Sequence, residues 1–172
     1  VVLLCAVFAA NISGAKINNN HYKVLKAEYE AKDGVTYIPL SYGFKHPNSA
    51  WGSIGITDKG MINVIVCDHI SDAAMYEFDT KKERLGFCGL LKDHFNHRFH
   101  YQRQPKVHTP LIQFSQNGLV YFGTDAGDES EYYLYGHFDE GYQGGYLVSY
   151  NPLSKEVRSL GLVQRMGGTK SM

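Results

Sequence analysis

The sequence has no excess of either charge, and this absence limits the partners that it can have. Its 172 residues contain 17 basic and 17 acidic side chains, so the formal net charge is zero. Proteins that bind nucleic acid normally carry a basic stripe or patch, which a neutral balance does not favour. We therefore expect no nucleic-acid partner, and the length favours about one domain.

The sequence also lacks a membrane span in its apolar N-terminal run, because residues 1–10 are too few to cross a bilayer as a helix. This run is similar to the core of a secretory signal, and the small residues at 13–15 suit cleavage. We predict that residues 1–15 belong to a truncated signal peptide and that the protein is secreted or periplasmic. The alternative is that the run forms a buried first strand.

Cysteine is scarce, and its positions argue against a disulfide. Of three cysteines, Cys5 lies in the apolar run, which leaves Cys67 and Cys88. We place these two on the second and fourth strands of one predicted sheet, where the strands lie roughly 10 Å apart. A disulfide requires a Cα separation below about 7 Å. We therefore predict two buried thiols.

What the sequence does contain is an internal repeat. Residues 78–91 (FDTKKERLGFCGLL) align without a gap with residues 150–163 (YNPLSKEVRSLGLV). The preceding runs, 60–68 and 118–125, also match as strand-like segments that end in Asp. Repeats of this size are supersecondary units that bury a face only against a neighbour. The 13 Tyr, 9 Phe and 18 Gly favour β-strands with many turns.

Each copy of the repeat predicts four short antiparallel strands, and Asn-Gly at 117–118 between apolar runs is a strong hairpin signal. We place the eight strands at residues 53–57, 61–67, 74–78, 84–90, 111–114, 119–124, 146–150 and 156–162. A further short strand is predicted at residues 35–40, whereas residues 16–33 show no clear period. The tail at 163–172 resembles the start of another unit.

The repeated pattern, an aromatic residue and Asp or Asn before a tight turn and a later Leu-Gly pair, resembles the blades of kelch-like, quinoprotein-like and gluconolactonase-like β-propellers. This resemblance covers about residues 50–165. It implies an all-β fold, a β-propeller of four-stranded antiparallel blades, present here as an incomplete N-terminal fragment because propellers need about four to eight blades. Residues 16–172 would form this partial propeller, with blades at about 50–91 and 108–163 and partial blades on either side. We expect the full propeller to be a monomer.

Blade topology also predicts where function lies. Loops after the second and fourth strands emerge at one end of a blade, and loops after the first and third strands emerge at the other. The latter loops are minimal in this sequence. The long segments all belong to the former set: 42–50, 68–72, 92–107 and 125–145. Long loops gathered at one end are where binding and catalysis usually occur.

His108 is the first candidate for catalysis, because we expect it to open the innermost strand of the second blade. Histidine can donate or accept a proton near neutral pH. Arg103 or Lys106 could neutralise a uronate carboxylate, and Tyr101 could return a proton to the leaving oxygen. Polysaccharide lyases of the propeller type use groups of this kind, so the resemblance implies β-elimination. The alternative is that His108 caps a strand and hydrogen-bonds to a neighbouring blade.

A divalent metal, calcium or zinc, is the one cofactor that the sequence raises. Asp68 and Asp125 end equivalent strands, and together with His69 and either His46 or His108 they could bind such an ion. The alternative is that each Asp caps the turn that follows it.

The histidines of segment 92–107 do not by themselves indicate a metal site. His94, His97 and His100 recur at a spacing that does not match the paired ligands of a standard zinc signature. We interpret this segment as a solvated loop, and a metal site that uses two of these histidines is the alternative.

The remaining candidates would bind substrate. Flat tyrosine faces could pack against sugar rings, for which the candidates are Tyr132, Tyr133, Tyr135 and Tyr142, and His46 and His69 are further substrate-binding candidates. The alternative for the segment that holds the tyrosines is a solvated loop that covers the next blade. The sequence therefore predicts a secreted propeller that acts on an extracellular polysaccharide or glycan, in one version as a polysaccharide lyase. The alternative is a non-catalytic propeller that binds a glycan or protein with the same loops. A lactonase or quinoprotein-like oxidoreductase is disfavoured because its docking motif and expected ligands are not recognisable.

Overall fold

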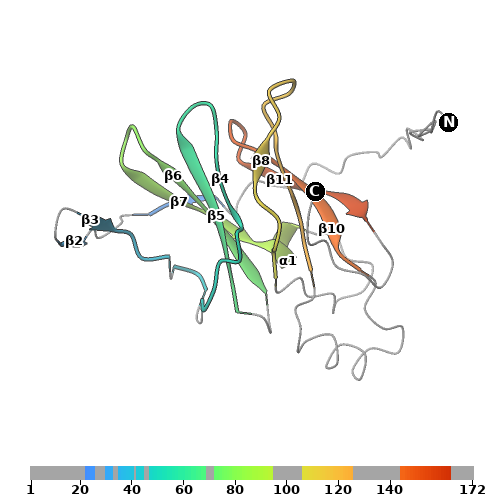
Figure 1. Ribbon diagram of the computed structural model, residues 1–172, viewed down its shortest axis with the longest axis horizontal. Helices are drawn as coiled ribbons and strands as arrows, with labels where there is room; N and C mark the ends of the chain where they lie inside the picture. The colour runs from blue at the N-terminus through green and yellow to red at the C-terminus, as the bar shows by residue number, and fades with distance from the viewer. Residues whose placement is uncertain are drawn as a thin grey trace.

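The chain folds into two antiparallel β-sheets that pack face to face (Figure 1). The first sheet has the strand order β1-β7-β6-β5-β4, the second has the order β11-β10-β9-β8, and β2 pairs with β3 apart from both. This computed structural model describes residues 22–25, 30–32, 35–40, 42–44, 47–68, 72–94, 106–125 and 144–163.

The strands are short and separated by tight turns, as aromatic and Gly-rich composition favours. In the first part of the chain they are β1 (Lys23–Val24), β2 (Glu30–Lys32), β3 (Val35–Tyr37), β4 (Ile54–Ile56), β5 (Met61–Cys67), β6 (Ala73–Asp79) and β7 (Arg84–Leu90). A single-turn helix follows, α1 (Leu91–His94). The second sheet contains β8 (Ile112–Gln113), β9 (Val120–Gly123), β10 (Tyr146–Asn151) and β11 (Glu156–Leu162).

The predicted all-β class is therefore confirmed in its coarse form, and all strands of the two sheets except β1 lie where the repeat placed them. β5, β7 and β11 have the predicted bounds, and the other predicted strands differ from the observed ones by one to three residues at an end. The sequence missed β1 and β2, because strands of two or three residues are too short to show a period. The finer prediction, a propeller, is not decided by two sheets.

The sequence repeat is also a repeat of backbone conformation. The ladder between the last two strands shifts register between Met75 and Tyr76 in the first sheet and between Leu147 and Val148 in the second. These positions are equivalent when the ungapped alignment is extended by three residues toward the N-terminus. Gly89 and Gly161, also equivalent, have φ angles of 118° and 121°. Both sheets therefore carry the same bulge and the same glycine bend.

The turn between the last two strands is built in the same way in both sheets. Asp79 Oδ1 accepts the backbone N–H groups of residues 81 and 82 at 3.0 and 3.1 Å. Asn151 Oδ1 accepts those of residues 153 and 154 at 2.9 and 3.2 Å. Glu83 and Lys155 end the turns with left-handed φ angles of 48° and 61°. A short polar side chain that binds its own turn explains why Asp and Asn begin the turn in the two copies.

The main core lies between the two sheets and combines aliphatic, aromatic and sulfur-containing side chains. Cys67 and Cys88 belong to it and are both free and buried, which confirms the prediction of two thiols without a disulfide. A second core lies on the opposite face of the first sheet, where Leu25, Ile38 and Phe44 pack against Tyr76 and other residues of that face.

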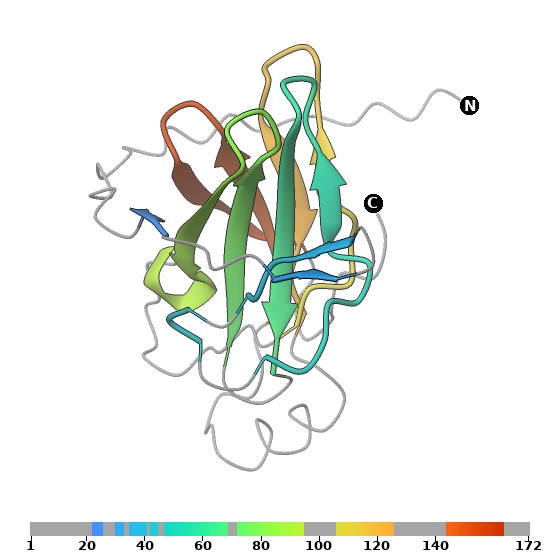
Figure 2. The same ribbon diagram turned by 90° about the vertical axis from the view of Figure 1, so that its left-hand side faces the viewer.

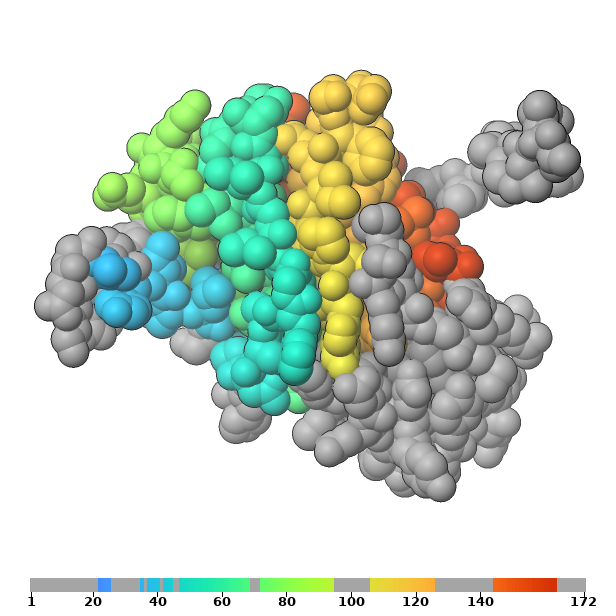
Figure 3. All heavy atoms as spheres, viewed as in Figure 1, coloured from blue at the N-terminus to red at the C-terminus, as the bar shows by residue number. Residues whose placement is uncertain are grey.

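The closest approach of the two sheets is between β4 and β8. A Cβ atom at Gly55 would lie 1.9 Å from the carbonyl oxygen of Leu111, so only glycine allows this separation. The backbone N–H of Leu111 donates to the carbonyl oxygen of Ile54 at 3.4 Å. β4 and β8, which are edge strands of the two sheets, are therefore neighbours and lie side by side on one surface (Figure 3).

All four hairpin turns emerge at one end of the pair of sheets (Figure 2). We call this end the hairpin end. We call the opposite end the loop end, because β5 and β9 run toward the loop end and the segments before β4 and β8 start there. Among the described residues, no helix is long and apolar enough to cross a membrane.

Candidate functional site

At the loop end, the segments that precede β4 and β8 are held in the same way in the two sheets. Ser49 pairs with Cys67 at the end of β5, and Lys106 pairs with Asp125 at the end of β9. The backbones of Lys106 and Asp125 exchange hydrogen bonds of 3.2 and 2.8 Å. These bridges hold the two segments that precede β4 and β8 as they approach each other from adjacent sheets.

Trp51, Lys106 and His108 meet where these segments approach, and we call them the Trp51 cluster. The rings of Trp51 and His108 are nearly parallel, with centroids 5.8 Å apart and an interplanar angle of 10°. Lys106 Nζ lies 5.6 Å from the centroid of the Trp51 ring, within the range of a cation–π contact. The cluster therefore joins a flat apolar face, an ammonium group and an imidazole.

Backbone contacts fix the cluster from behind. Thr109 Oγ1 accepts the N–H of Gly123 at 2.7 Å and donates to the carbonyl oxygen of the same residue at 3.3 Å, which ties the chain after His108 to β9. Gly52 follows Trp51 with a φ angle of 73°, a conformation that favours glycine. The tryptophan is thus presented on a tight bend, and it is 53% exposed.

Burial separates the roles of the three side chains. Lys106 is only 1% exposed, and His108 is partly exposed although its Nε2 atom is buried. A charge with little water around it interacts more strongly with an incoming ion than a surface charge does. This arrangement suits the binding of a flat, partly apolar ring that carries an anionic group.

Two of the four predicted catalytic residues are therefore brought together, Lys106 and His108. Trp51 was missed as a candidate, although a signal was present, because it is the only tryptophan and precedes a predicted first strand just as His108 does. Apart from Asp68 and Asp125, the other predicted site residues lie outside the described residues, as do two histidines of segment 92–107: His46, His69, His97, His100, Tyr101, Arg103, Tyr132, Tyr133, Tyr135 and Tyr142. Their roles stay predictions.

Asp68 caps the turn that follows it. Its Oδ1 accepts the backbone N–H of Asp72 at 3.2 Å, and its carbonyl oxygen accepts a hydrogen bond from Asn48 Nδ2 at 3.2 Å. This is the structural alternative to the metal site proposed for Asp68, His69 and Asp125. Among the described residues, no group of three His, Cys, Asp or Glu side chains is arranged to hold a metal ion.

His94 corrects the interpretation of segment 92–107 as a solvated loop at its first residues. It lies in α1, is 5% exposed, and its Nε2 is 2.9 Å from the carbonyl oxygen of Cys88. The helical turn folds the imidazole back onto the end of β7, and hydrophobic packing with a local hydrogen bond outweighs solvation. Sequence spacing alone carries no sign of this contact.

Asp72 is a buried carboxyl group at the loop end that the sequence did not single out. It is 1% exposed, and burial raises its pKa to about 7, against the opposing effect of the backbone N–H groups of Ala73 and Lys92. Both of its oxygens lie 3.4 Å from the N–H of Lys92. Asp72 therefore changes charge near neutral pH and links the end of loop 68–72 to the start of α1.

Comparison with known proteins adds a partial match. The chain is 28% identical over 115 residues to 3-oxoacyl-[acyl-carrier-protein] synthase 1 of Escherichia coli strain K12, and equally to that of E. coli O6:H1. The match covers 65% of this chain and 26% of the synthase, so the chain spans about a quarter of the length of these proteins. No family model and no solved structure matches the chain.

Proposed function

We propose that this chain is part of an extracellular β-propeller whose loop end binds an acidic carbohydrate. The Trp51 cluster is the observation that carries the proposal. Sugar rings have an apolar face that packs on exposed aromatic rings, because both surfaces lose contact with water. A buried ammonium beside the aromatic ring favours a sugar that carries a carboxylate.

The way in which the two sheets stack supports a ring. Met75 and Cys88 contribute to the core between the sheets, and so do Val148 and Tyr150 of the second sheet. The repeat partners of the last two are Tyr76 and Phe78, which belong to the core on the far face of the first sheet. The two sheets therefore use opposite faces of the same unit, and head-to-tail contacts of this kind repeat into rings.

β-Elimination is the reaction that we assign to this site. His108 removes the proton next to the carboxylate of a uronate, the bond from the ring to the leaving glycosidic oxygen breaks, and a ring double bond forms. The leaving oxygen takes up a proton from an acid, for which Tyr101 is the candidate. Lys106 stabilises the charge that develops on the carboxylate as the proton leaves.

The experiment is to incubate the protein with polygalacturonate and with alginate, and to follow the ultraviolet absorbance of the unsaturated product together with retention on gels that contain each polymer. Trp51→Ala is expected to weaken retention about tenfold, the effect of losing one aromatic contact of about 1.4 kcal/mol. His108→Asn is expected to abolish product formation and leave retention nearly unchanged.

Phe114→Ala is the matched control, because Phe114 is 48% exposed but lies next to the β8–β9 turn at the hairpin end. If the parent protein and His108→Asn both retain the polymers and neither forms product, the protein is a non-catalytic glycan-binding propeller and not a lyase. Equal effects of Trp51→Ala and Phe114→Ala, or no retention on either polymer, would refute the carbohydrate site itself.

The synthase named in the sequence match does not lead to a second proposal. Acyl transfer through cysteine needs an accessible thiol of lowered pKa. Burial raises the pKa of Cys67 to about 11 and that of Cys88 to about 12, and neither reaches the surface. The described part of the chain therefore offers no cysteine suited to that chemistry.

A further inference from the structure

A pocket lies at the hairpin end, far along the strands from the Trp51 cluster. It has a volume of about 390 Å³, which is within the range of small-molecule sites. Its walls come from the turns of both sheets and from Tyr22, and its apolar part from Met61, Pro152 and Leu153. The charged side chains that line it are Lys59, Lys81, Lys82, Arg84, Lys155, Glu77 and Asp79.

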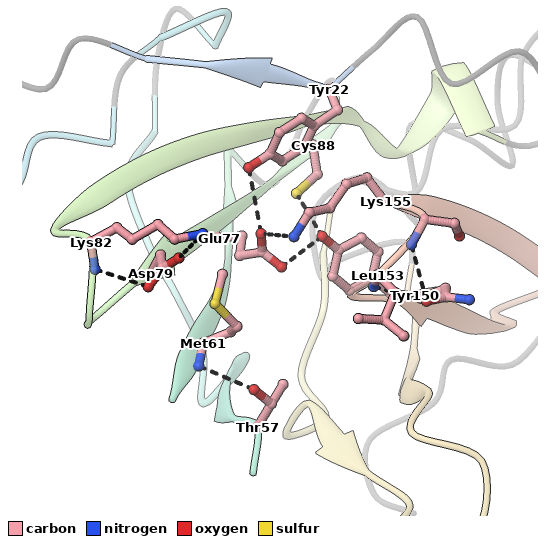
Figure 4. A network of polar contacts seen from close by, with 12 residues as sticks. Tyr22, Thr57, Met61, Glu77, Asp79, Lys82, Cys88, Tyr150, Leu153 and Lys155 are labelled. Atoms are coloured by element: carbon pink, nitrogen blue, oxygen red, sulfur yellow. Dashed lines mark hydrogen bonds and ion pairs between the residues drawn. The ribbon is translucent and has the colours of Figure 1, made fainter. Parts of the chain in front are cut away.

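A network of buried polar groups forms the floor of this pocket (Figure 4). The carboxylate of Glu77 is fully buried and forms an ion pair with Lys155 Nζ. Tyr150 donates a hydrogen bond to Glu77 Oε2 at 2.8 Å, and Tyr22 lies 3.5 Å from Oε1. The ion pair with Glu77 joins Lys155, at the β10–β11 turn of the second sheet, to β6 of the first sheet, and Lys155 also lines the pocket.

The lysines of the β6–β7 turn are not needed to make that turn. The equivalent β10–β11 turn has the same side-chain-to-backbone bonds and the same left-handed last residue, yet it contains Leu153 and Ser154 where the first has Lys81 and Lys82. Arg84 likewise corresponds to a glutamate in the second sheet. The basic residues are therefore additions to a turn that folds without them.

The charges in the pocket do not balance. Five cationic side chains face two carboxylates, of which Glu77 is taken by Lys155 and Asp79 lies 3.7 Å from Lys82. Among the described residues, no carboxylate forms an ion pair with Lys59, Lys81 or Arg84. In a chain of zero net charge, three turns bring like charges together, which repel each other unless an anion lies between them.

We propose that this pocket binds a small polyanion of the size of a phosphorylated or sulfated sugar. Arg84 provides a planar guanidinium that can hold two oxygens of a phosphate or sulfate. Lys59 and Lys81 close the site from neighbouring turns, and Lys155, anchored by Glu77, supplies a fixed charge at its floor. The apolar wall of Met61 and Leu153 suits the body of a sugar better than a bare ion.

The test is titration calorimetry with two probes, pyrophosphate and a heparin-derived sulfated disaccharide, at low and at physiological ionic strength. We expect one saturable site per chain, with an affinity that falls as salt rises. Arg84→Gln and Lys59→Gln are each expected to weaken binding about tenfold, because each removes a hydrogen bond between charged groups. Tighter binding of one probe identifies the phosphate or the sulfated sugar as the natural chemistry.

Arg158→Gln is the matched control, because Arg158 is an exposed arginine on the last strand of the second sheet and does not line the pocket. It should bind both probes as the parent does. No saturable binding of either probe, or an equal loss in Arg158→Gln, would overturn the proposal. Trp51→Ala should leave this binding unchanged, so the pocket and the carbohydrate site fail or succeed independently.

Discussion

Asp72 shows how a single buried carboxyl group makes stability depend on pH. Its pKa is raised from 3.8 to about 7 in the folded chain, mainly by burial. Between these two values the folded state therefore holds a proton that the unfolded state has lost. The free energy of unfolding must then fall as pH rises through this window, by about 1.4 kcal/mol for each pH unit.

Asp72→Asn removes this titration, and its side-chain oxygen can still accept the N–H of Lys92. We expect the variant to gain stability relative to the parent as pH rises from about 4 to 7, by a few kcal/mol in total, in urea denaturation followed by circular dichroism. Asp79→Asn is the control, because the pKa of Asp79 is shifted in the opposite direction. Slight desolvation raises this pKa, but the backbone N–H groups of Lys82 and Lys81 lower it overall. Parallel pH profiles of Asp72→Asn and the parent would contradict the assignment.

Other residues that decide the structure carry no visible pattern in the sequence. Glu77 lies in a strand segment of alternating character, and nothing near it indicates that residues 22, 150 and 155 would meet its carboxylate. The same holds for Trp51 and His108, which are 57 positions apart in the sequence and stack in the folded chain. Contacts of this kind depend on how two sheets are placed, so their chemistry follows from tertiary structure.

At the scale of the element, local sequence predicts strands and turns well in this chain. The apolar run of β5 and the repeat of β7 and β11 predicted the observed bounds, and Asp79 and Asn151 start turns because their side chains accept N–H groups of the turn itself. The segments that the sequence missed, β1, β2 and α1, have only two to four residues, and β1 and α1 lie against β7.

Gly55→Ala tests the close contact of the first strands. Its Cβ atom would overlap the carbonyl oxygen of Leu111, so β4 and β8 must separate. We expect a loss of about 1–3 kcal/mol in the free energy of unfolding, the usual cost of overpacking, measured by urea denaturation. The separation should also weaken the stacking of Trp51 on His108, seen as a change in tryptophan fluorescence.

Ile56→Ala serves as the control on the same strand, because Ile56 is 66% exposed and its truncation removes little buried surface. If Gly55→Ala unfolds at the same urea concentration as the parent, the two strands are not held at the observed separation, and the position of the Trp51 cluster loses its structural basis.

For the whole molecule, the outer face of the second sheet is the feature that matters most. Ile112, Phe114, Tyr121 and Leu147 line an apolar hollow of about 580 Å³ on this sheet, and Leu160 is 43% exposed. In the repeat, Leu147 and Leu160 correspond to Met75 and Cys88, which the first sheet buries against the second. This face is therefore the one with which a unit of this type covers its successor.

A further sheet of the same repeat is the occupant that we expect on this face. When it is uncovered, the chain should associate through it, and sedimentation should show a mass that rises with concentration. Leu160→Lys should shift the chain toward monomer, whereas Leu153→Lys, at a turn leucine that is 74% exposed, should not. A chain that stays monomeric at all concentrations would show that this face needs no cover.

The sequence by itself determined the unit of this protein: strand positions, tight turns, two free thiols and a net charge of zero, since each follows from local pattern or composition. Only the tertiary structure decided how two copies of the unit stack, and therefore that Trp51 meets His108 and that basic turns surround a pocket over Glu77. The reason is physical. A residue's own neighbours set its backbone conformation, whereas chemistry between sheets requires side chains from distant segments, and burial fixes their charge and separation.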